Sequence, residues 1–420
     1  MIIKTKVQDS LWSILFLFVF AGSALNAIAY DFKVDGIYYN YGDTEFTVSV
    51  TSGLPKCSGD VVIPATVEYN GVTYTVTAIE DYALDLSPDL TSVTIPATVA
   101  RIGKLALTGS PNLGSIVVDS ANEVFDSRDN CNAVIETATN TLLFGCKNTV
   151  IPNTVTAIGY SAFDSADITE LNIPPSVVTI ADRAFAYCAK MTSISFGSSV
   201  ASIGFRIFEG SNNLTEIIVD GNNQTFDCRN NCNAIIETAT NKLVAGCKST
   251  IIPDDVTIIG DYAFKSCQNL SSITIPNSVA IIGNHAFDDC YYYLTSIELP
   301  NSVRSIGEYA FKNCKALKTI TIPKSVAIIG DYAFDHCNLE SVTCLATIPP
   351  FAGANSFYTY NTTTLYVPSY LVNTYQTADV WKKFRTIIGI DLPSENYDVN
   401  GDGQVTIADV TNLIDYLLSH

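Results

Sequence analysis

The residues whose types and spacing indicate the most specific chemistry lie near the C-terminus, from Asp398 to Asp409. Side chains that carry oxygen stand at positions 1, 3, 5, 9 and 12 of this stretch, namely Asp398, Asn400, Asp402, Thr406 and Asp409. Gly403 lies at position 6, where a calcium loop turns sharply, and Gln404 at position 7 can offer its backbone carbonyl. The stretch therefore predicts a Ca²⁺ site formed by these oxygen donors. The alternative is an acidic turn that binds no metal.

The residues that follow the loop predict a helix with one apolar face. That face carries Val410, Leu413, Ile414, Leu417 and Leu418. A loop of the form D-x-N-x-D-G-x-V that leads into a helix resembles one repeat of a type I dockerin. The resemblance implies calcium binding, and it places Ile407 and Ala408 at positions that help to select a cohesin partner. Asp409 stands where an ordinary EF-hand has Glu, which is usual in dockerins, whereas one repeat is present where a dockerin has two.

Most of the chain before this loop consists of imperfect copies of one unit, shown most clearly by residues 275–290. One recurring position is an isoleucine, usually followed by glycine: Ile79, Ile102, Ile158, Ile180, Ile203, Ile259, Ile282, Ile306 and Ile329. Five residues later each copy has Leu or Phe: Leu84, Leu107, Phe163, Phe185, Phe208, Phe264, Phe287, Phe311 and Phe334. Regular steps are about 23 residues, within the range of leucine-rich-repeat coils. Because one coil cannot bury these residues alone, the spacing predicts a solenoid whose equivalent residues stack.

Each coil is predicted to contain two short extended pieces and little helix. Residues 270–275 alternate as a strand that ends at Pro276, because proline lacks the backbone donor. Residues 279–282 form the second piece, and Gly283 supplies a turn with positive φ. Residues 285–290 then have room only for a helical or 3₁₀ turn. The expected fold class is a mainly β solenoid of short parallel strands.

The repeated pattern I-P-x-S-V-x-x-I-G-x-x-A-F-x-x-C-x-x-L resembles the BspA-type leucine-rich repeats over roughly residues 61–344. That family is associated with bacterial cell-surface and secreted proteins that bind host or neighbouring-cell ligands. The resemblance therefore implies adhesion or recognition. Proline stands where more conventional repeats have an asparagine ladder, so that ladder is not expected here.

The regions outside the repeats divide the chain further. Alternating residues in 30–60 predict an N-terminal β-hairpin cap, since a solenoid exposes an apolar cross-section at each end. A predicted strand and short helix with Trp381 make 345–390 the C-terminal cap. Residues 391–397 are a predicted linker to the single calcium repeat at 398–420.

The first 29 residues have the pattern of a secretory signal peptide. Lys4 and Lys6 precede an apolar run over residues 11–20, and the small-x-small motif 27–29 predicts a mature chain that starts at Tyr30. The alternative is a membrane anchor, although the apolar run is short for a bilayer core of about 30 Å. The expected location is outside the cell, either secreted or on a bacterial surface.

Two steps between the recurring isoleucines are 56 residues long, at inserts near 119–150 and 220–251. The inserts are copies of each other, 101 residues apart, so a block of several coils was duplicated, and each predicts a β-hairpin. If the first hairpin pairs Glu136 with Thr141, its two cysteines face each other. An exported protein would then carry a disulfide in each hairpin, and the alternative is a pair of reduced thiols. The two pairs are Cys131 with Cys146 and Cys232 with Cys247.

The other repeated cysteines are predicted to pack as small apolar residues. They recur three residues after the phenylalanines, at Cys188, Cys267, Cys290, Cys314 and Cys337. No close Cys-x-x-Cys or Cys/His group in the sequence indicates zinc.

The composition argues against nucleic acid and against catalysis. With 42 acidic and 23 basic residues, the formal charge of −19 repels phosphate backbones and anionic lipid. The chain has three histidines, and none belongs to a recognisable Ser/His/Asp set, phosphate loop or acid pair that stands apart from the repeat. We therefore expect a protein that is not an enzyme.

The predicted binding face is the outward side of the repeated strands, where residues vary while the apolar positions stay constant. Its residues are Thr94, Val117, Asn172, Ser195, Ile218, Thr274, Glu298, Thr321 and Thr343. The first hypothesis is recognition of a host or neighbouring-cell protein or glycan on this face. The second is a component of an extracellular polysaccharide-degrading assembly that docks to a cohesin through calcium. A solvated sheet with no partner is the remaining interpretation of the face.

Overall fold

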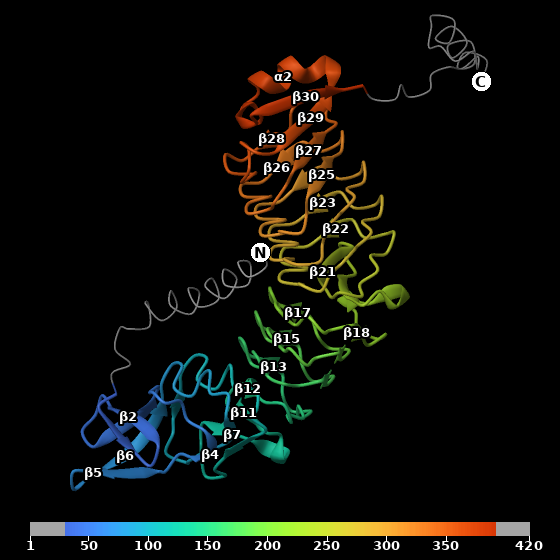
Figure 1. The fold of residues 1–420 in the computed structure, drawn as a ribbon. Helices are drawn as coiled ribbons and strands as arrows, with labels where there is room; N and C mark the ends of the chain where they lie inside the picture. Colours follow the sequence, from blue (N-terminus) through green and yellow to red (C-terminus); the bar gives the residue numbers. More distant parts are fainter. Residues whose placement is uncertain (1–29, 392–420) are drawn as a thin grey trace, which may run out of the picture.

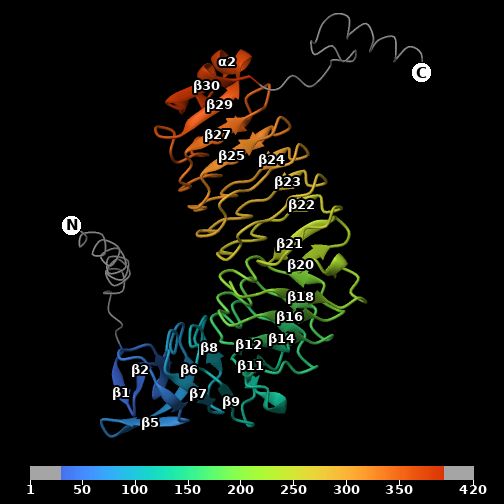
Figure 2. The ribbon, with the colours of Figure 1, turned by 45° about the vertical axis from the view of Figure 1, so that its right-hand side comes forward.

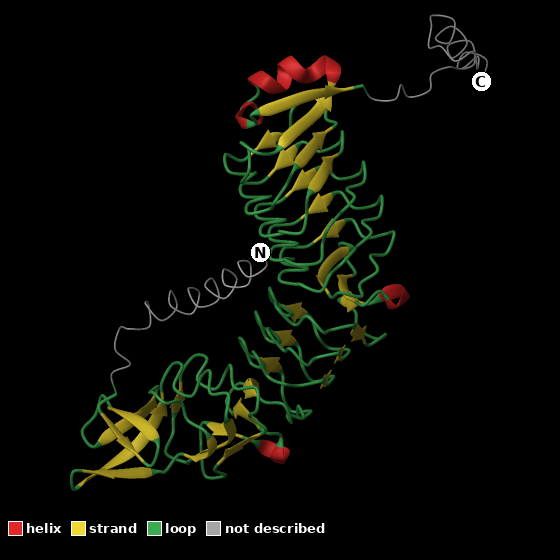
Figure 3. Cartoon of the chain, in the orientation of Figure 1, coloured by secondary structure: helices red, strands yellow, loops and turns green. Residues whose placement is uncertain are grey.

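The computed structural model describes residues 30–391, which form an elongated solenoid of stacked coils (Figure 1). The predicted signal peptide at 1–29 and, from residue 392 on, the predicted linker and calcium repeat lie outside the described residues. Short strands joined by turns dominate the described part, and its helices are few and short (Figure 3). The mainly β solenoid predicted from the repeat is therefore confirmed.

A sheet, rather than a single hairpin, closes the N-terminal end. It contains β1 (Phe32–Val34), β2 (Ile37–Tyr41), β3 (Thr47–Thr51), β5 (Thr66–Tyr69) and β6 (Val72–Ile79). Strand β6 pairs in parallel with β3 on one side and with β8 (Arg101–Ile102) of the next coil on the other. The hairpin predicted at 30–60 is thus part of a larger cap that continues directly into the repeats.

Each coil adds short strands to one or both of two parallel ladders. The ladder that carries the recurring isoleucines contains, beyond β8, β13 (Ala157–Ile158), β15 (Thr179–Ile180), β17 (Ser202–Ile203), β22 (Ile258–Ile259), β23 (Ile281–Ile282), β24 (Ser305–Ile306), β26 (Ile328–Ile329) and β28 (Phe351–Ala352). The second ladder contains β4 (Gly59–Val62), β7 (Leu90–Ile95), β9 (Ser115–Val118), β14 (Glu170–Ile173), β16 (Ser193–Phe196), β18 (Glu216–Val219), β25 (Thr319–Ile322), β27 (Ser341–Cys344), β29 (Thr364–Pro368) and β30 (Thr386–Ile390). The strand predicted at 270–275 is absent, because those residues lack ladder hydrogen bonds.

Stacked aromatic rings fill the core of the C-terminal coils. Phe264, Phe287, Phe311, Phe334 and Phe357 stack with neighbouring ring centroids 5.1–5.3 Å apart and planes within 6° of parallel. The first four are fully buried, and so are the recurring isoleucines of the same coils, Ile259, Ile282, Ile306 and Ile329. Each coil therefore buries its apolar residues only against the coils before and after it, as a solenoid requires.

The glycine after each isoleucine lets the backbones of two neighbouring coils lie close together, and it is not needed for a positive φ. Gly283 does not have positive φ, but a Cβ placed on it would lie 2.7 Å from the backbone nitrogen of Asp261 in the preceding coil. The left-handed residues come later in the coil, at His285 (φ 54°) and Asp289 (φ 63°). Because these residues interrupt helical geometry, 284–289 form turns, and the helical or 3₁₀ turn predicted there is wrong.

The left-handed turn residues join neighbouring coils through their backbones. The N–H of His285 donates to the carbonyl of Glu308 at 2.8 Å, and the N–H of Asp289 donates to that of Lys312 at 2.9 Å. A side-chain ladder runs beside them: Asn284 Oδ1 accepts the N–H of Glu308 at 2.8 Å. The equivalent carboxylates of Asp81, Asp182, Asp261 and Asp331 accept the corresponding N–H of the next coil. This ladder stabilises the turns much as an asparagine ladder would.

The two inserts divide the core into three blocks that follow one another along a curved axis (Figure 2). In the first insert, β11 (Ala133–Glu136) and β12 (Thr141–Gly145) form a hairpin, and β12 joins the isoleucine ladder through β13. Alternate residues of a strand point to opposite faces. Accordingly Val134 packs into the N-terminal core and Ile135 into the middle core. The second insert repeats this with β20 (Ala234–Glu237) and β21 (Lys242–Gly246).

The disulfides predicted in these hairpins are not present, and the register behind them is wrong by one residue. Glu136 does pair with Thr141, but a bulge between Val134 and Ile135 shifts the rest of the ladder, so that Ala133 pairs with Gly145. Cys131 and Cys146 are therefore not directly opposed, and both are free buried thiols. The same bulge separates the second pair, Cys232 and Cys247.

The C-terminal end is closed by aromatic side chains from outside the repeats. Helix α2 (Val372–Thr377) and the short turn η4 (Trp381–Lys383) lie over the last coil (Figure 1). Trp381 is fully buried, and its indole N–H donates to the carbonyl of Pro350 at 2.8 Å. Phe384 lies edge-on to Phe357, the last ring of the stack, at 5.3 Å. The apolar cross-section is thereby covered.

Candidate binding surface

The outward residues predicted as a binding face lie in register along the second ladder. Thr94 pairs with Val117, and Thr321 pairs with Thr343. In the middle block the paired positions are Asn172, Ser195 and Ile218. Thr274 and Glu298 are exposed too, but they lie on the two segments that form no strand. The structure therefore brings most of the predicted face together as three short columns, one in each block.

The column residues offer hydroxyl groups and small apolar surfaces. Val117 and Ile218 are 46% and 43% exposed, which is high for side chains on a sheet. Ser195 donates a hydrogen bond to Asn172 Oδ1 at 2.6 Å. Glu298 is the one ionisable residue among the nine predicted positions. Such a surface can hydrogen-bond and pack against a ligand, but it brings together no set of groups for acid–base or nucleophilic chemistry.

A second exposed column, which sequence reasoning missed, lies two residues before the phenylalanine stack. The rings of Tyr262, His285, Tyr309 and Tyr332 stack in consecutive coils with centroids 4.6–4.9 Å apart. All four are half-buried and have left-handed φ. The signal was visible as an aromatic residue at one repeat position in four successive coils. Because the rings cover one another's faces, this column presents ring edges and hydroxyl groups to solvent.

Beneath this column lies a cluster of neutralised charges. Lys265 Nζ lies 2.7 Å from Asp288 Oδ2 and 2.9 Å from Asp289 Oδ2, and His285 Nδ1 also contacts Asp288 Oδ2 at 2.7 Å. Burial opposes ionisation of Asp288, but hydrogen bonds from His285 and Lys265 outweigh it and lower the pKa of the carboxyl. Burial likewise opposes the charge on Lys265, yet its two carboxylate partners raise its pKa. The cluster joins adjacent coils and is a structural ion-pair network.

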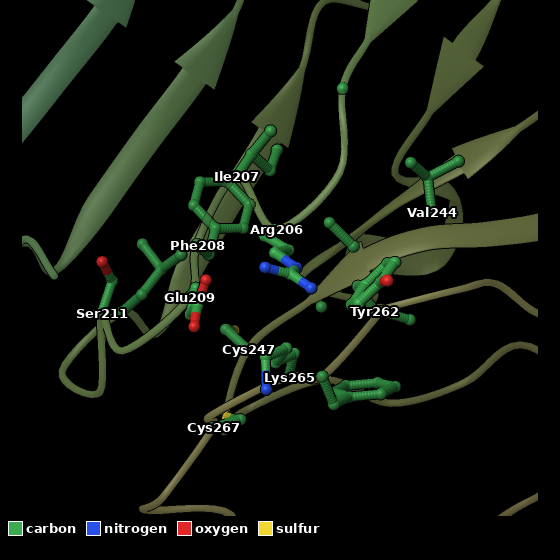
Figure 4. A pocket seen from close by; sticks show the side chains of 16 residues that line it. Arg206, Ile207, Phe208, Glu209, Ser211, Val244, Cys247, Tyr262, Lys265 and Cys267 are labelled. Carbon is green, nitrogen blue, oxygen red and sulfur yellow. The ribbon is translucent and has the colours of Figure 1, made fainter. Parts of the chain in front are cut away.

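Where the second insert meets the next coil, a narrow pocket lies between Arg206, Glu209 and Lys265 (Figure 4). The guanidinium of Arg206 lies 4.5 Å from the ring centroid of Tyr262, the first ring of the column, and makes a cation–π contact with it. The free volume is about 20 Å³, room for about one water molecule. This pocket is too small for a ligand larger than a water molecule.

A wider cavity of about 500 Å³ lies between β4 and the N-terminal cap. Its wall mixes apolar residues with both signs of charge, including Lys33, Lys56, Asp60 and Glu68. Cys57, also in the wall, has a raised pKa because it is partly buried, so its thiol stays protonated at neutral pH. The cavity lacks the convergent polar groups that would identify a ligand.

The predicted calcium ligands Asp398, Asn400, Asp402, Gln404, Thr406 and Asp409, with the predicted partner contacts Ile407 and Ala408, lie outside the described residues. Within residues 30–391, no group of three or more His, Cys, Asp or Glu side chains is placed to hold a metal ion. In the same part of the chain, none of the helices has the length and apolar character needed to cross a membrane.

A family model described as BspA type leucine rich repeat region matches residues 67–141, 141–242 and 235–364. Among solved structures, the pneumococcal vaccine antigen PcpA aligns over 86% of this chain and 98% of its own, with 19% identity and a TM-score of 0.49. A leucine rich cell surface protein from Faecalibacterium prausnitzii aligns over 89% and 98%, with 20% identity and a TM-score of 0.43. A leucine-rich repeat protein from Bacteroides ovatus aligns over 87% and 83%, with 22% identity and a TM-score of 0.39. Comparison with curated proteins gave no match.

Proposed function

Because the chain belongs to the BspA-type leucine-rich repeat family, we propose that it is a non-catalytic recognition or adhesion protein, secreted or held at a bacterial cell surface. Its ligand is a protein or glycan of a host or neighbouring cell, bound on the outward side of the second ladder. The signal-peptide pattern of residues 1–29 supports export. The strongly acidic composition argues against nucleic acid as the partner.

The observation that carries this proposal is the contrast between the two faces of the same strands. In β16, Ile194 and Phe196 point inward and are buried, as their equivalents are in other coils, whereas Ser195 points outward. The outward position changes from coil to coil among Thr, Val, Asn, Ser, Ile and Glu. Inward residues must stack on their copies, so they are constrained, but outward residues are free to match a ligand.

Binding of the full chain to glycan arrays and to host-matrix proteins tests the proposal. Two variants change the face without touching the core: Glu298→Lys reverses a charge, and Asn172→Ala removes the amide that accepts a hydrogen bond from Ser195. We expect at least one variant to weaken binding of a ligand that the unchanged chain binds. If substitutions across the whole face leave binding unaltered, the site lies elsewhere.

A second candidate function rests on the donor set of the sequence from Asp398 to Asp409. Its carboxylate and amide oxygens have the spacing of a calcium loop, and we propose that it binds Ca²⁺. By its likeness to a dockerin repeat, the loop would then dock the chain to a cohesin in a polysaccharide-degrading assembly. Titration calorimetry of the full chain, with Asp402→Ala as the control, measures Ca²⁺ uptake and cohesin binding separately. Ca²⁺ uptake with no cohesin complex would refute the docking role alone.

A further inference from the structure

One coil of the C-terminal block is longer than its neighbours. The coil that starts at Ile282 has 24 residues before the next recurring isoleucine, whereas the coils before and after it have 23. The extra residue lies between Cys290 and Leu294, in a loop made of three consecutive tyrosines, residues 291–293. This loop departs from the repeat, so the demands of stacking do not account for it.

The extra residue widens a turn that the adjoining coils share. In those coils the N–H of Leu270 donates to the carbonyl of Cys267, and the N–H of Leu317 to that of Cys314, both at 3.1 Å. These bonds span three residues. Leu294 comes four positions after Cys290, so residues 291–293 form a wider turn in which Leu294 makes no such three-residue bond.

Two extended segments in and beside this coil have no ladder partners. Residues 271–275 and 295–299 form no backbone hydrogen bond with any other described residue. In the middle block, by contrast, β14, β16 and β18 pair continuously. The exposed hydroxyls within these segments, those of Ser272 and Ser296, are likewise unpaired, whereas Ser195 in the middle block is bonded. These exposed hydroxyl groups are therefore available to an outside partner at no cost in internal hydrogen bonds.

Exposed aromatic rings border this unpaired surface. Tyr292 and Tyr293 are 61% and 55% exposed. Neighbouring rings meet edge to face, tilted by 62° for Tyr291 and Tyr292 and by 65° for Tyr292 and Tyr293, so they are not stacked face on face. Lys315 donates to the hydroxyl of Tyr291 at 2.6 Å and lies 4.4 Å from its ring centroid, which anchors the base of the loop.

We propose that the tyrosine loop, residues 291–293, and the adjoining segments 271–275 and 295–299 form a glycan-binding site. This inference rests on the proposed function, because it names the ligand class and the location on the same outward surface. A sugar ring has a flat C–H face that packs on an open aromatic ring, and its hydroxyls both donate and accept hydrogen bonds. The site offers both kinds of contact. Glu298 is the one charged residue in the three segments, so an ionic ligand has little to pair with.

An extended peptide is the competing ligand. It would bind by strand addition, which needs an open sheet edge, whereas residues 295–299 lie between the coil of 271–275 and the coil of β25. It would not require ring faces held at an angle to each other beside the strand. The combination of tilted exposed rings with unpaired hydroxyls favours the sugar.

The test uses the full chain and an array of neutral and acidic oligosaccharides, followed by affinity electrophoresis in gels that contain the best-bound polysaccharide. The double variant Tyr292→Ala/Tyr293→Ala removes the rings. Tyr160→Ala is the matched control, since Tyr160 is 51% exposed on a middle coil. We expect the double variant to bind the array-positive glycan about tenfold more weakly and the control to bind unchanged, as for the loss of a central aromatic contact.

Deletion of Tyr292 gives a second test that separates binding from folding. It restores the 23-residue spacing of the neighbouring coils, so the narrower turn of those coils can form before Leu294 and the chain should fold at least as stably. We expect glycan binding to be lost while the thermal midpoint is kept or raised. Retention of full affinity in this variant or in the double tyrosine variant would overturn the site.

The remaining outcomes decide between the two proposals. If glycan binding is lost with Asn172→Ala and kept in the tyrosine variants, the outward face still functions in recognition, but this location is wrong. If the chain binds protein ligands alone and the tyrosine variants lose them, the ligand class is wrong. If no glycan binds, the glycan site is refuted, and the host-matrix measurements with Glu298→Lys decide the recognition role separately.

Discussion

Replacement of Gly307 by alanine tests how closely the coils are stacked. A Cβ at this position would lie 2.6 Å from the backbone nitrogen of Asn284 and 2.6 Å from the carbonyl carbon of Gly283. Ordinary contact begins at 3.4 Å, so the coils must separate locally by about 3.4 − 2.6 = 0.8 Å. Both obstacles are backbone atoms, which cannot rotate away as the end of a side chain could.

The cost of that separation follows from the bonds that cross the same gap. The N–H of Gly307 donates to the carbonyl of Ile282 at 2.8 Å, and the N–H of Glu308 donates to Asn284 Oδ1 at 2.8 Å. At about 1 kcal/mol each, weakening both bonds costs about 2 kcal/mol, within the range of 1–3 kcal/mol typical of overpacking. Urea unfolding followed by far-ultraviolet circular dichroism measures this as a lower midpoint with an unchanged slope.

Gly221→Ala is the control for this experiment. Nothing lies within 4 Å of the position that its Cβ would take, and its φ is not positive. Its effect should be within about 0.5 kcal/mol. Equal midpoints for Gly307→Ala and Gly221→Ala would refute the argument that these glycines are required for coil-to-coil approach.

Three further predictions concern buried polar groups. Cys314 donates through its thiol to the carbonyl of Phe287 at 3.2 Å. We therefore expect Cys314→Ala to lower the free energy of unfolding by about 1 kcal/mol, and Cys314→Ser to lower it by less, as measured by urea unfolding. A larger loss for serine than for alanine would contradict this role. Because the pKa of Asp288 is lowered, its stabilising effect is complete above the unfolded value of about 3.9 and is lost as the pH falls through the lower folded value. Asp288→Asn should therefore reduce stability at neutral pH and flatten the acid limb of the stability profile, and an unchanged limb would argue against the ion-pair cluster. Finally, alkylation in denaturant without reductant should modify all 12 cysteines by mass spectrometry, and fewer would show that the hairpin thiols are bonded.

The repeat made most of the fold predictable. Residues such as Ile282 and Phe287 recur at a nearly constant spacing, and burial against their own copies is the arrangement that removes them from water. The hairpin inserts were predictable as well, because the two copies share their residues. The pairing of Glu136 with Thr141 is confirmed. The bulge between Val134 and Ile135 was not predictable, since packing on both faces of the hairpin decides where it forms.

The candidate surface was predictable only in part. Alternation along β16 predicts that Ser195 points outward, because a strand has a period of two. It does not predict that Tyr262 and His285 stack, since their left-handed backbone depends on hydrogen bonds to the following coil. Nor does it predict that residues 295–299, in the coil with residues 291–293, form no strand, because strand pairing depends on the placement of the adjoining coils.

By itself, the sequence determined the solenoid, the constant inward residues and the positions of the irregular coils, because periodic burial is a one-dimensional property of the chain. The tertiary structure alone decided which thiols face each other, what the glycines do and where polar groups stay unpaired. Those features depend on contacts between coils about 23 residues apart, where a bulge or one additional residue changes the register of everything that follows.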